Sequence, residues 1–281
     1  MKLSKMGKIW SAATGTRVLE GGKASFLFYF FLTHALNVAK SSFGPLPRSV
    51  VSLMDSSKKR FVIQNGVGIF HVRPFNDSLT ISADYFESEL KRWVGMPKGR
   101  NVCIDIGANI GRYTLLAARE FAYERVVSVE ANPITFDVLK KNISLNGLEE
   151  KVSLVQVAVS DNSEPVSFEV DKQHLGGGKV VDKASGVPQW DTVVTVPAIT
   201  VDELCKEQNV AYSSVDFVKM DVEGFECEVL AGMQQTLKGM PAGSSMMIEI
   251  SEKNKEKCIS SITDAGFSLV ESSNCDYLFS K

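Results

Sequence analysis

The segment Val102–Gly111, which reads Val-Cys-Ile-Asp-Ile-Gly-Ala-Asn-Ile-Gly, constrains the fold more than any other part of the chain. It predicts an apolar strand that ends at Asp105 and a tight loop before a helix from about Arg112. Three loop residues tolerate a positive φ angle, namely Gly107, Asn109 and Gly111. A second apolar strand, Arg125 to Val129, ends at Glu130. This order of strand, glycine loop, helix, strand and acid predicts a nucleotide-binding βαβ unit.

The chemistry of this loop favours S-adenosylmethionine (SAM) over a dinucleotide. A dinucleotide loop follows the pattern G-x-G-x-x-G and places pyrophosphate on the helix N-terminus, whereas here Asn109 replaces the middle glycine. A carboxylate at Asp105 would repel pyrophosphate but suits the α-ammonium of a methionine moiety. Glu130 is placed to accept the ribose hydroxyls. The alternative interpretation is that Asp105 only caps the loop and the glycines only turn it.

Charge is distributed unevenly along the chain. Residues 1–60 hold ten Lys and Arg and only two acids, a net charge of +8, and the other 21 basic and 31 acidic residues give −10. The acidic remainder argues against a nucleic-acid substrate.

Five cysteines without paired or metal-type spacing indicate a reducing compartment, so we expect a cytoplasmic protein and no metal site.

Residues 26–39 form an apolar stretch that is short for a membrane span, which needs roughly 20 apolar residues. No clear signal-peptide cleavage site follows it. Three interpretations remain open: a helix packed on the main domain, an interfacial membrane helix, or a short signal-anchor. Residues 1–50 are therefore the candidate region for peripheral membrane contact.

The sequence divides into three parts. Residues 1–50 form a basic appendage with the short apolar helix. Residues 51–99 hold a predicted hairpin that turns at Asn65-Gly66 and an amphipathic helix, Asp84 to Val94, which lead into the core. Residues 100–281 form the cofactor-binding domain.

Strands alternate with helices in residues 100–281, which predicts a mainly parallel α/β sheet with helices on both faces. The third strand is expected over Val152–Val159, and one helix from about Phe225 to Leu237. Ligands of such sheets bind beyond the carboxyl ends of the strands. Five acids fall at predicted strand ends: Asp105, Glu130, Asp161, Asp221 and Glu249.

Several of these segments together resemble the FkbM-like family of SAM-dependent methyltransferases. They are Val102–Gly111, Val129–Pro133, Ala158–Asp161, Thr200–Leu204 and Val218–Glu226. The pattern Lys-x-Asp-x-Glu-Gly-x-Glu in the last segment is the most family-specific. The resemblance implies a Rossmann-like class I methyltransferase fold, with a seven-stranded sheet whose last strand is antiparallel. It also implies O-methylation of a hydroxyl on a sugar, glycan or other small-molecule or lipid-linked acceptor.

The expected cofactor site comprises two acids, the loop and two strand ends. We expect Asp105 and the Gly107 backbone to hold the methionine end of SAM and Glu130 to hold the ribose. Val159 and Asp161 are expected to frame the adenine. The remaining candidates are Asn109, which either shapes the loop or contacts the SAM carboxylate, Gly111, which turns the loop, and Asn132, which starts the helix after Glu130.

Methyl transfer also needs a base for the acceptor proton, and the candidates are Asp221, Glu223 and His174. Lys219 is expected to pair with an acid or to orient the acceptor. Each has a plainer interpretation: Asp221 as a helix N-cap, Glu223 as a partner of the helix dipole, and His174 as a surface residue. A hard cation held by Asp221, Glu223 and Glu249 is a less favoured possibility.

Two other functions remain open from the sequence. One is a nucleotide-dependent oxidoreductase or sugar-modifying enzyme, which the missing phosphate-binding glycines disfavour. The other is a non-catalytic membrane- or partner-binding module on the same fold, which the presence of both Asp105 and Glu130 disfavours.

Overall fold

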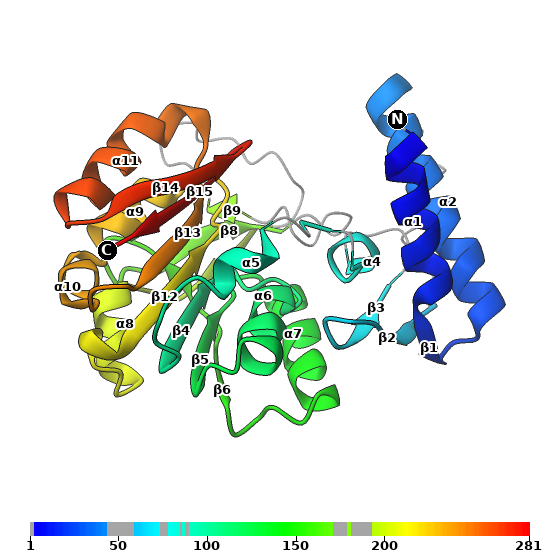
Figure 1. The fold of residues 1–281 in the computed structure, drawn as a ribbon, viewed down its shortest axis with the longest axis horizontal. Helices are drawn as coiled ribbons and strands as arrows, with labels where there is room; N and C mark the ends of the chain where they lie inside the picture. Colours follow the sequence, from blue (N-terminus) through cyan, green and yellow to red (C-terminus); the bar gives the residue numbers. More distant parts are fainter. Residues whose placement is uncertain are drawn as a thin grey trace. The chain divides into compact units, whose positions relative to one another are not determined.

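A computed structural model describes residues 3–43, 59–73, 78–84, 86–87, 90–170, 179–180 and 193–281 (Figure 1). The chain divides into two compact units. The first is essentially Met1–Ser88, and the second comprises Glu89–Asp171 and Gly177–Lys281. Each unit is described by itself.

The second unit is built on a seven-stranded sheet in the order β14-β15-β13-β12-β4-β5-β6. Its strands are β4 (Val102–Ile106), β5 (Arg125–Val129), β6 (Val152–Val155), β12 (Val215–Met220), β13 (Ser245–Glu249), β14 (Ser268–Ser273) and β15 (Asp276–Ser280). The last strand, β15, runs antiparallel to both neighbours, while the other pairs are parallel. The predicted α/β fold, with seven strands and an antiparallel last strand, is confirmed.

Helices pack on the sheet through apolar side chains that alternate along its strands. The elements are α5 (Lys91–Val94), α6 (Arg112–Leu115), a π-helical turn (Leu116–Glu120), α7 (Pro133–Leu145), α8 (Val201–Glu207), α9 (Glu226–Ala231), α10 (Gln234–Gly239) and α11 (Lys255–Asp264). Helices α8 to α11 share one buried cluster with strand residues such as Val218 and Met246. Phe217 points to the opposite face, where its ring lies 6.4 Å from the ring of Tyr123.

The expected third strand is interrupted, so the prediction of one strand over Val152–Val159 is wrong. β6 ends at Val155, and β7 (Ala158–Val159) pairs instead with β11 (Ala198–Ile199) in a separate two-stranded parallel sheet. The chain pairs with β5 only as far as Val155, and beyond that point it pairs with β11, which lies about forty residues later in the sequence. Nearby, β8 (Val166–Glu169) pairs with both β9 (Lys179–Val180) and β10 (Val193–Val196).

The helix predicted over Phe225–Leu237 is two helices, α9 and α10. Asp202 causes the new start, because its carboxylate accepts hydrogen bonds from Gln235 N (3.0 Å) and Thr236 N (2.8 Å) in the first turn of α10. Gly232 lies between the helices, where a Cβ would fall 2.2 Å from the Ser160 carbonyl oxygen. Close packing at this glycine therefore fixes the break.

In its described residues, the first unit combines the helices α1 and α2 and the helical turn α4 with a three-stranded sheet in the order β1-β2-β3. Its elements are α1 (Leu3–Gly15), β1 (Arg17–Glu20), α2 (Lys23–Phe43), β2 (Phe61–Gln64), β3 (Ile69–Val72) and the single turn α4 (Ser78–Ile81). Phe26 of α2 packs edge-on against Phe61 of β2, with ring centroids 5.6 Å apart. Residues 26–39 are thus helical, and among the described residues no helix is long and apolar enough to cross a membrane.

The predicted hairpin is present, but its loop has four residues rather than two, since Gln64 pairs with Ile69. Asn65 Oδ1 accepts hydrogen bonds from the backbone N–H groups of Val67 and Gly68, which stabilises the wider turn.

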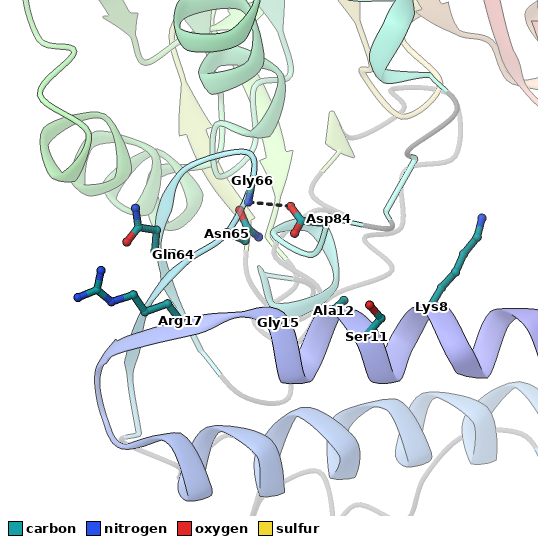
Figure 2. A pocket seen from close by; sticks show the side chains of 9 residues that line it. All are labelled: Lys8, Ser11, Ala12, Gly15, Arg17, Gln64, Asn65, Gly66 and Asp84. Carbon is teal, nitrogen blue, oxygen red and sulfur yellow. Dashed lines mark hydrogen bonds between the residues drawn. The ribbon is translucent and has the colours of Figure 1, made fainter.

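A cavity in this unit is lined by α1 and the hairpin loop, where Gly66 N donates to Asp84 Oδ1 at 3.1 Å (Figure 2).

Of the helix predicted over Asp84–Val94, the residues that the structure describes hold only the single turn α5, Lys91–Val94. Asp84 bonds to the hairpin loop instead of starting a helix. Glu87 has a φ angle of 45°, which is incompatible with a continuous right-handed helix.

Candidate functional site

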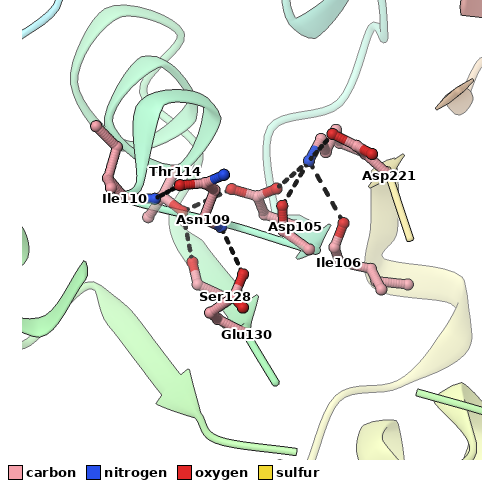
Figure 3. Close-up of polar contacts among 10 residues, drawn as sticks. Asp105, Ile106, Asn109, Ile110, Thr114, Ser128, Glu130 and Asp221 are labelled. Atoms are coloured by element: carbon pink, nitrogen blue, oxygen red, sulfur yellow. Dashed lines mark hydrogen bonds and ion pairs between the residues drawn. The ribbon is translucent and has the colours of Figure 1, made fainter. Parts of the chain in front are cut away.

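The neighbouring strands β4 and β12 place a buried cation between two carboxylates. Their register sets Lys219 opposite Asp105. The Lys219 Nζ atom lies 3.7 Å from Asp105 Oδ1 and 3.7 Å from Asp221 Oδ2, and it donates to the Gly107 carbonyl at 2.7 Å. The two carboxylates are labelled in Figure 3. Lys219 is only 4% exposed. It therefore pairs with two acids, where the sequence suggested one, and it does so as a buried residue between the strand ends.

Asp105 is fully buried. Its Oδ2 atom accepts a hydrogen bond from Thr114 Oγ1 at 2.6 Å, and that hydroxyl lies 2.8 Å from Ser128 Oγ. Burial raises the pKa of Asp105, while the Lys219 ammonium and the Thr114 hydrogen bond oppose the rise. The carboxylate thus ties β4 to α6 and β12, and presents no surface to solvent.

The glycine loop has the backbone that the sequence predicts. The φ angles are +70° at Gly107, +52° at Asn109 and +93° at Gly111, all in the left-handed region. Gly107 also packs on the turn after β12, because a Cβ there would lie 1.8 Å from the Asp221 carbonyl oxygen. A side chain is therefore excluded at Gly107 by both conformation and space.

Glu130, at the end of β5, holds the glycine loop through a hydrogen bond to its backbone. Its Oε2 atom accepts from Asn109 N and its Oε1 atom from Asn132 N, each at 2.8 Å. Burial raises the pKa of Glu130 to about 7, against the effect of these two hydrogen bonds. Asn132 in turn caps α7 by accepting from Ile134 N at 3.0 Å, with Pro133 at the first helical position, as predicted.

The turn after β12 carries two of the proposed base candidates. The Asp221 side chain is 38% exposed, and Glu223 lies at the surface with a left-handed φ of 48°. Although part of the Glu223 side chain reaches solvent, enclosure of its carboxyl group by the surrounding protein, followed by the carboxylates of Asp221, Glu249 and Glu226, raises its pKa to about 7. The interpretation of Asp221 as an N-cap is wrong, because the residue before α9 is Phe225 and no side chain caps that helix.

The remaining residues predicted for the site differ in how far they are exposed to solvent. Val159 is buried in β7, whereas Asp161 is exposed and accepts from Ser160 Oγ (3.1 Å) and Asn162 Nδ2 (2.7 Å). His174 lies outside the described residues. Within the described ranges, no three His, Cys, Asp or Glu side chains gather as a metal would require, and this includes Asp221, Glu223 and Glu249.

Three polar residues of this region were missed from the sequence: Thr114, Ser128 and Glu226. Ser128 could have been noticed as a polar residue among the valines of β5. Glu226 belongs to the family-specific pattern, which does not by itself indicate what its side chain contacts. Nothing in the local sequence marks Thr114, because its partner Asp105 lies on a different element.

The sequence matches the model of the Methyltransferase FkbM domain over residues 105–279. The hexuronic acid methyltransferase AglP of Haloferax volcanii is 26% identical over 200 residues, which are 70% of this chain and 73% of that protein. The methyltransferase sdnD of Sordaria araneosa is 25% identical over 155 residues, 47% of this chain and 60% of that protein. Among solved structures, TYW2 of P. horikoshii in complex with MeSAdo is 14% identical and has a TM-score of 0.44, covering 79% of this chain and 70% of that chain.

The close approach at Gly107 can be separated from its backbone strain by comparing two substitutions. Gly107→Ala and Gly147→Ala both put alanine at a left-handed φ, which costs about 1 kcal/mol, but only Gly107 meets another atom there. We expect Gly107→Ala to lower the free energy of unfolding by about 1–3 kcal/mol more than Gly147→Ala. Urea unfolding measures both values, and equal losses would show that the Asp221 contact is unimportant.

Proposed function

The chain belongs to the FkbM methyltransferase family, and on that premise we propose that it methylates a hydroxyl oxygen of a sugar or glycan. The observation that carries the proposal is the acidic turn at the carboxyl end of β12. The Asp221 and Glu223 side chains of this turn reach solvent, and the Asp221 carbonyl packs on Gly107 of the glycine loop. The resemblance to a hexuronic acid methyltransferase supports a sugar as the acceptor.

The cofactor is SAM, which when bound supplies an electrophilic methyl group on a sulfonium. The residues of this edge fit such a group. Each Glu130 oxygen accepts one backbone hydrogen bond and retains a lone pair for a ribose hydroxyl. We assign the methionine end to the loop around Gly107 and Asn109. Asp105 is fully buried, so we propose that its charge acts on that end through the electrostatic field and through Lys219.

We assign the adenine to the surface formed by Val159 and Asp161 after β7. This surface lies near the end of β5, because Glu130 N donates a hydrogen bond to Val155 O, and Val155 is three residues before the start of β7. Gly111 and Asn132 then act on the cofactor indirectly, by shaping the loop and starting α7.

The charge of the site favours a hydroxyl acceptor over a carboxylate acceptor. A carboxylate is already ionised and needs no base, and the acids of the Asp221 turn would repel it. A neutral hydroxyl approaches these acids without that penalty and must lose a proton. Glu223, whose pKa is about 7, suits the role of base near neutral pH. Asp221 is the other candidate, held in place by Lys219.

Binding of S-adenosylhomocysteine should strengthen as the pH rises, because a ribose hydroxyl is accepted by the ionised form of Glu130. With a pKa of about 7 in the free protein, the ionised fraction rises about tenfold between roughly pH 6 and 8. We expect calorimetric titration to show a corresponding gain in affinity, absent in Glu130→Gln and retained in Glu223→Gln. Binding of NAD in place of S-adenosylhomocysteine would contradict the cofactor assignment and favour an oxidoreductase.

Glu223→Gln should lower kcat by about 10²–10⁴-fold, since it removes the base but keeps the shape of the side chain. Affinity for S-adenosylhomocysteine should stay the same. Turnover is measured as S-adenosylhomocysteine released with neutral and uronic nitrophenyl glycosides as acceptors. The control is Glu252→Gln, whose side chain is 90% exposed. A kcat within twofold of the wild type would exclude Glu223 as the base, and absence of turnover with every acceptor would favour a non-catalytic module.

We further propose that the first unit contacts an anionic membrane surface. Trp10 and Phe28 are 61% and 63% exposed, and Trp10 stacks on Phe31 of α2 with ring centroids 5.3 Å apart. Exposed aromatic side chains on helices in a segment of net charge +8 are typical of binding at the interface of an anionic bilayer.

The test is co-sedimentation with phosphatidylcholine vesicles, with and without phosphatidylglycerol. We expect binding only with the anionic lipid, and its loss in the double variant Trp10→Ser, Phe28→Ser. Leu269→Ser with Val270→Ser is the matched control, because these residues of β14 are also half exposed. Equal binding by both double variants, or binding that ignores phosphatidylglycerol, would contradict the proposal. A dimer lost in the aromatic variant, without vesicle binding, would assign the patch to a second copy of the chain.

A further inference from the structure

We propose that Glu226 is a positioning residue which, with Asn254, clamps Gly224 and thereby holds the turn 221–224 in its working conformation. The inference rests on the function proposed above, because that turn carries both candidate bases. Glu226 itself is 2% exposed and lies in the first turn of α9, so it does not touch the acceptor.

The clamp contacts both backbone groups of Gly224. Glu226 Oε1 accepts from Gly224 N at 2.8 Å, and Asn254 Nδ2 donates to Gly224 O at 3.0 Å. The two side chains are joined, because Asn254 Nδ2 also donates to Glu226 Oε2. Ser251 Oγ donates to the same oxygen at 3.0 Å. The segment after β13, residues 251–254, therefore holds the turn that follows β12.

The turn needs such a clamp because its backbone is strained. Glu223 and Gly224 have consecutive left-handed φ angles of 48° and 94°. The left-handed conformation is unfavourable for a residue with a Cβ such as Glu223, and it persists only where surrounding contacts fix it. The start of the turn is fixed separately, by Asp221 N donating to Ile106 O at 3.1 Å. Glu226 and Asn254 fix the end of the turn in the same way, through their hydrogen bonds to Gly224.

Glu226 also acts on Glu223 by charge. The carboxylates of Asp221 at the end of β12, Glu249 at the end of β13 and Glu226 on α9 all raise the pKa of Glu223, and Lys219 lowers it. Lys253 lies beside the turn as well, with Nζ 3.7 Å from the position of a Cβ on Gly224. Glu226→Gln removes one negative charge and leaves an amide nitrogen that cannot accept a hydrogen bond. It should therefore lower the pKa of Glu223 and loosen the turn.

The experiment compares three variants. Glu226→Gln and Asn254→Ala each break one side of the clamp. Asp202→Asn is the matched control: Asp202 is another buried carboxylate that accepts from two backbone N–H groups and a hydroxyl, but it holds α10 rather than the turn. All are studied at a temperature where each is folded.

Two measurements require no turnover. Hydrogen–deuterium exchange in peptides covering residues 221–226 should accelerate in Glu226→Gln and Asn254→Ala and not in Asp202→Asn. Carboxyl ¹³C NMR of Glu223 should show its pKa falling in Glu226→Gln from about 7. Unchanged exchange and titration in both clamp variants would overturn the inference, whether or not the wild type is active.

Turnover supplies the third measurement. We expect kcat of Glu226→Gln and Asn254→Ala to fall at least about tenfold with unchanged affinity for S-adenosylhomocysteine, because a small displacement of a catalytic group is enough for such a loss. The acid limb of the pH–rate profile should move to lower pH in Glu226→Gln only. If the wild type shows no turnover but the variants show the expected changes in exchange and titration, the clamp is supported and the proposed reaction is contradicted. An active wild type whose clamp variants behave like Asp202→Asn would overturn the clamp.

Discussion

The arrangement of this site depends on one buried ammonium group. Lys219 lies between Asp105 and Asp221 and donates to the carbonyl of Gly107. A buried charge is tolerated only when it is paired and hydrogen-bonded, so the two acids and the loop carbonyl fix one another through Lys219. The strand register that sets Lys219 beside Asp105 thus couples the cofactor loop after β4 to the acidic turn after β12.

Two turns of left-handed backbone meet where these strands end. One contains Gly107, Asn109 and Gly111, and the other Glu223 and Gly224. Each is fixed by a carboxylate from a neighbouring element: Glu130 accepts from Asn109 N, and Glu226 accepts from Gly224 N. In both halves of the site, therefore, an acid accepts a hydrogen bond from a backbone N–H group in a left-handed turn.

Local chemistry made part of this structure predictable from the sequence. The positive φ angles of the loop, the Asn132 cap and the strand ending at Glu130 each follow from a few adjacent residues. The break after Val155 and the split between α9 and α10 were not predictable in this way, because they arise from partners more than thirty residues away. The sequence pattern likewise contains Glu226 but does not indicate its partner Asn254, which lies 28 residues further along the chain.

Burial of Lys219 also determines how the molecule responds to its solution. Dissolved ions screen charges that face solvent, over a distance of about 10 Å at roughly 0.1 M salt, but they act much less on pairs enclosed by protein. The Lys219 pair with Asp105, where the two side chains are 5% and 0% exposed, belongs to the enclosed kind. The basic residues among positions 1–60 that are exposed, such as Lys8 and Arg17, belong to the screened kind. Added salt should therefore weaken the attraction of the amino-terminal segment for anionic surfaces, while it changes the interaction between Lys219 and Asp105 very little.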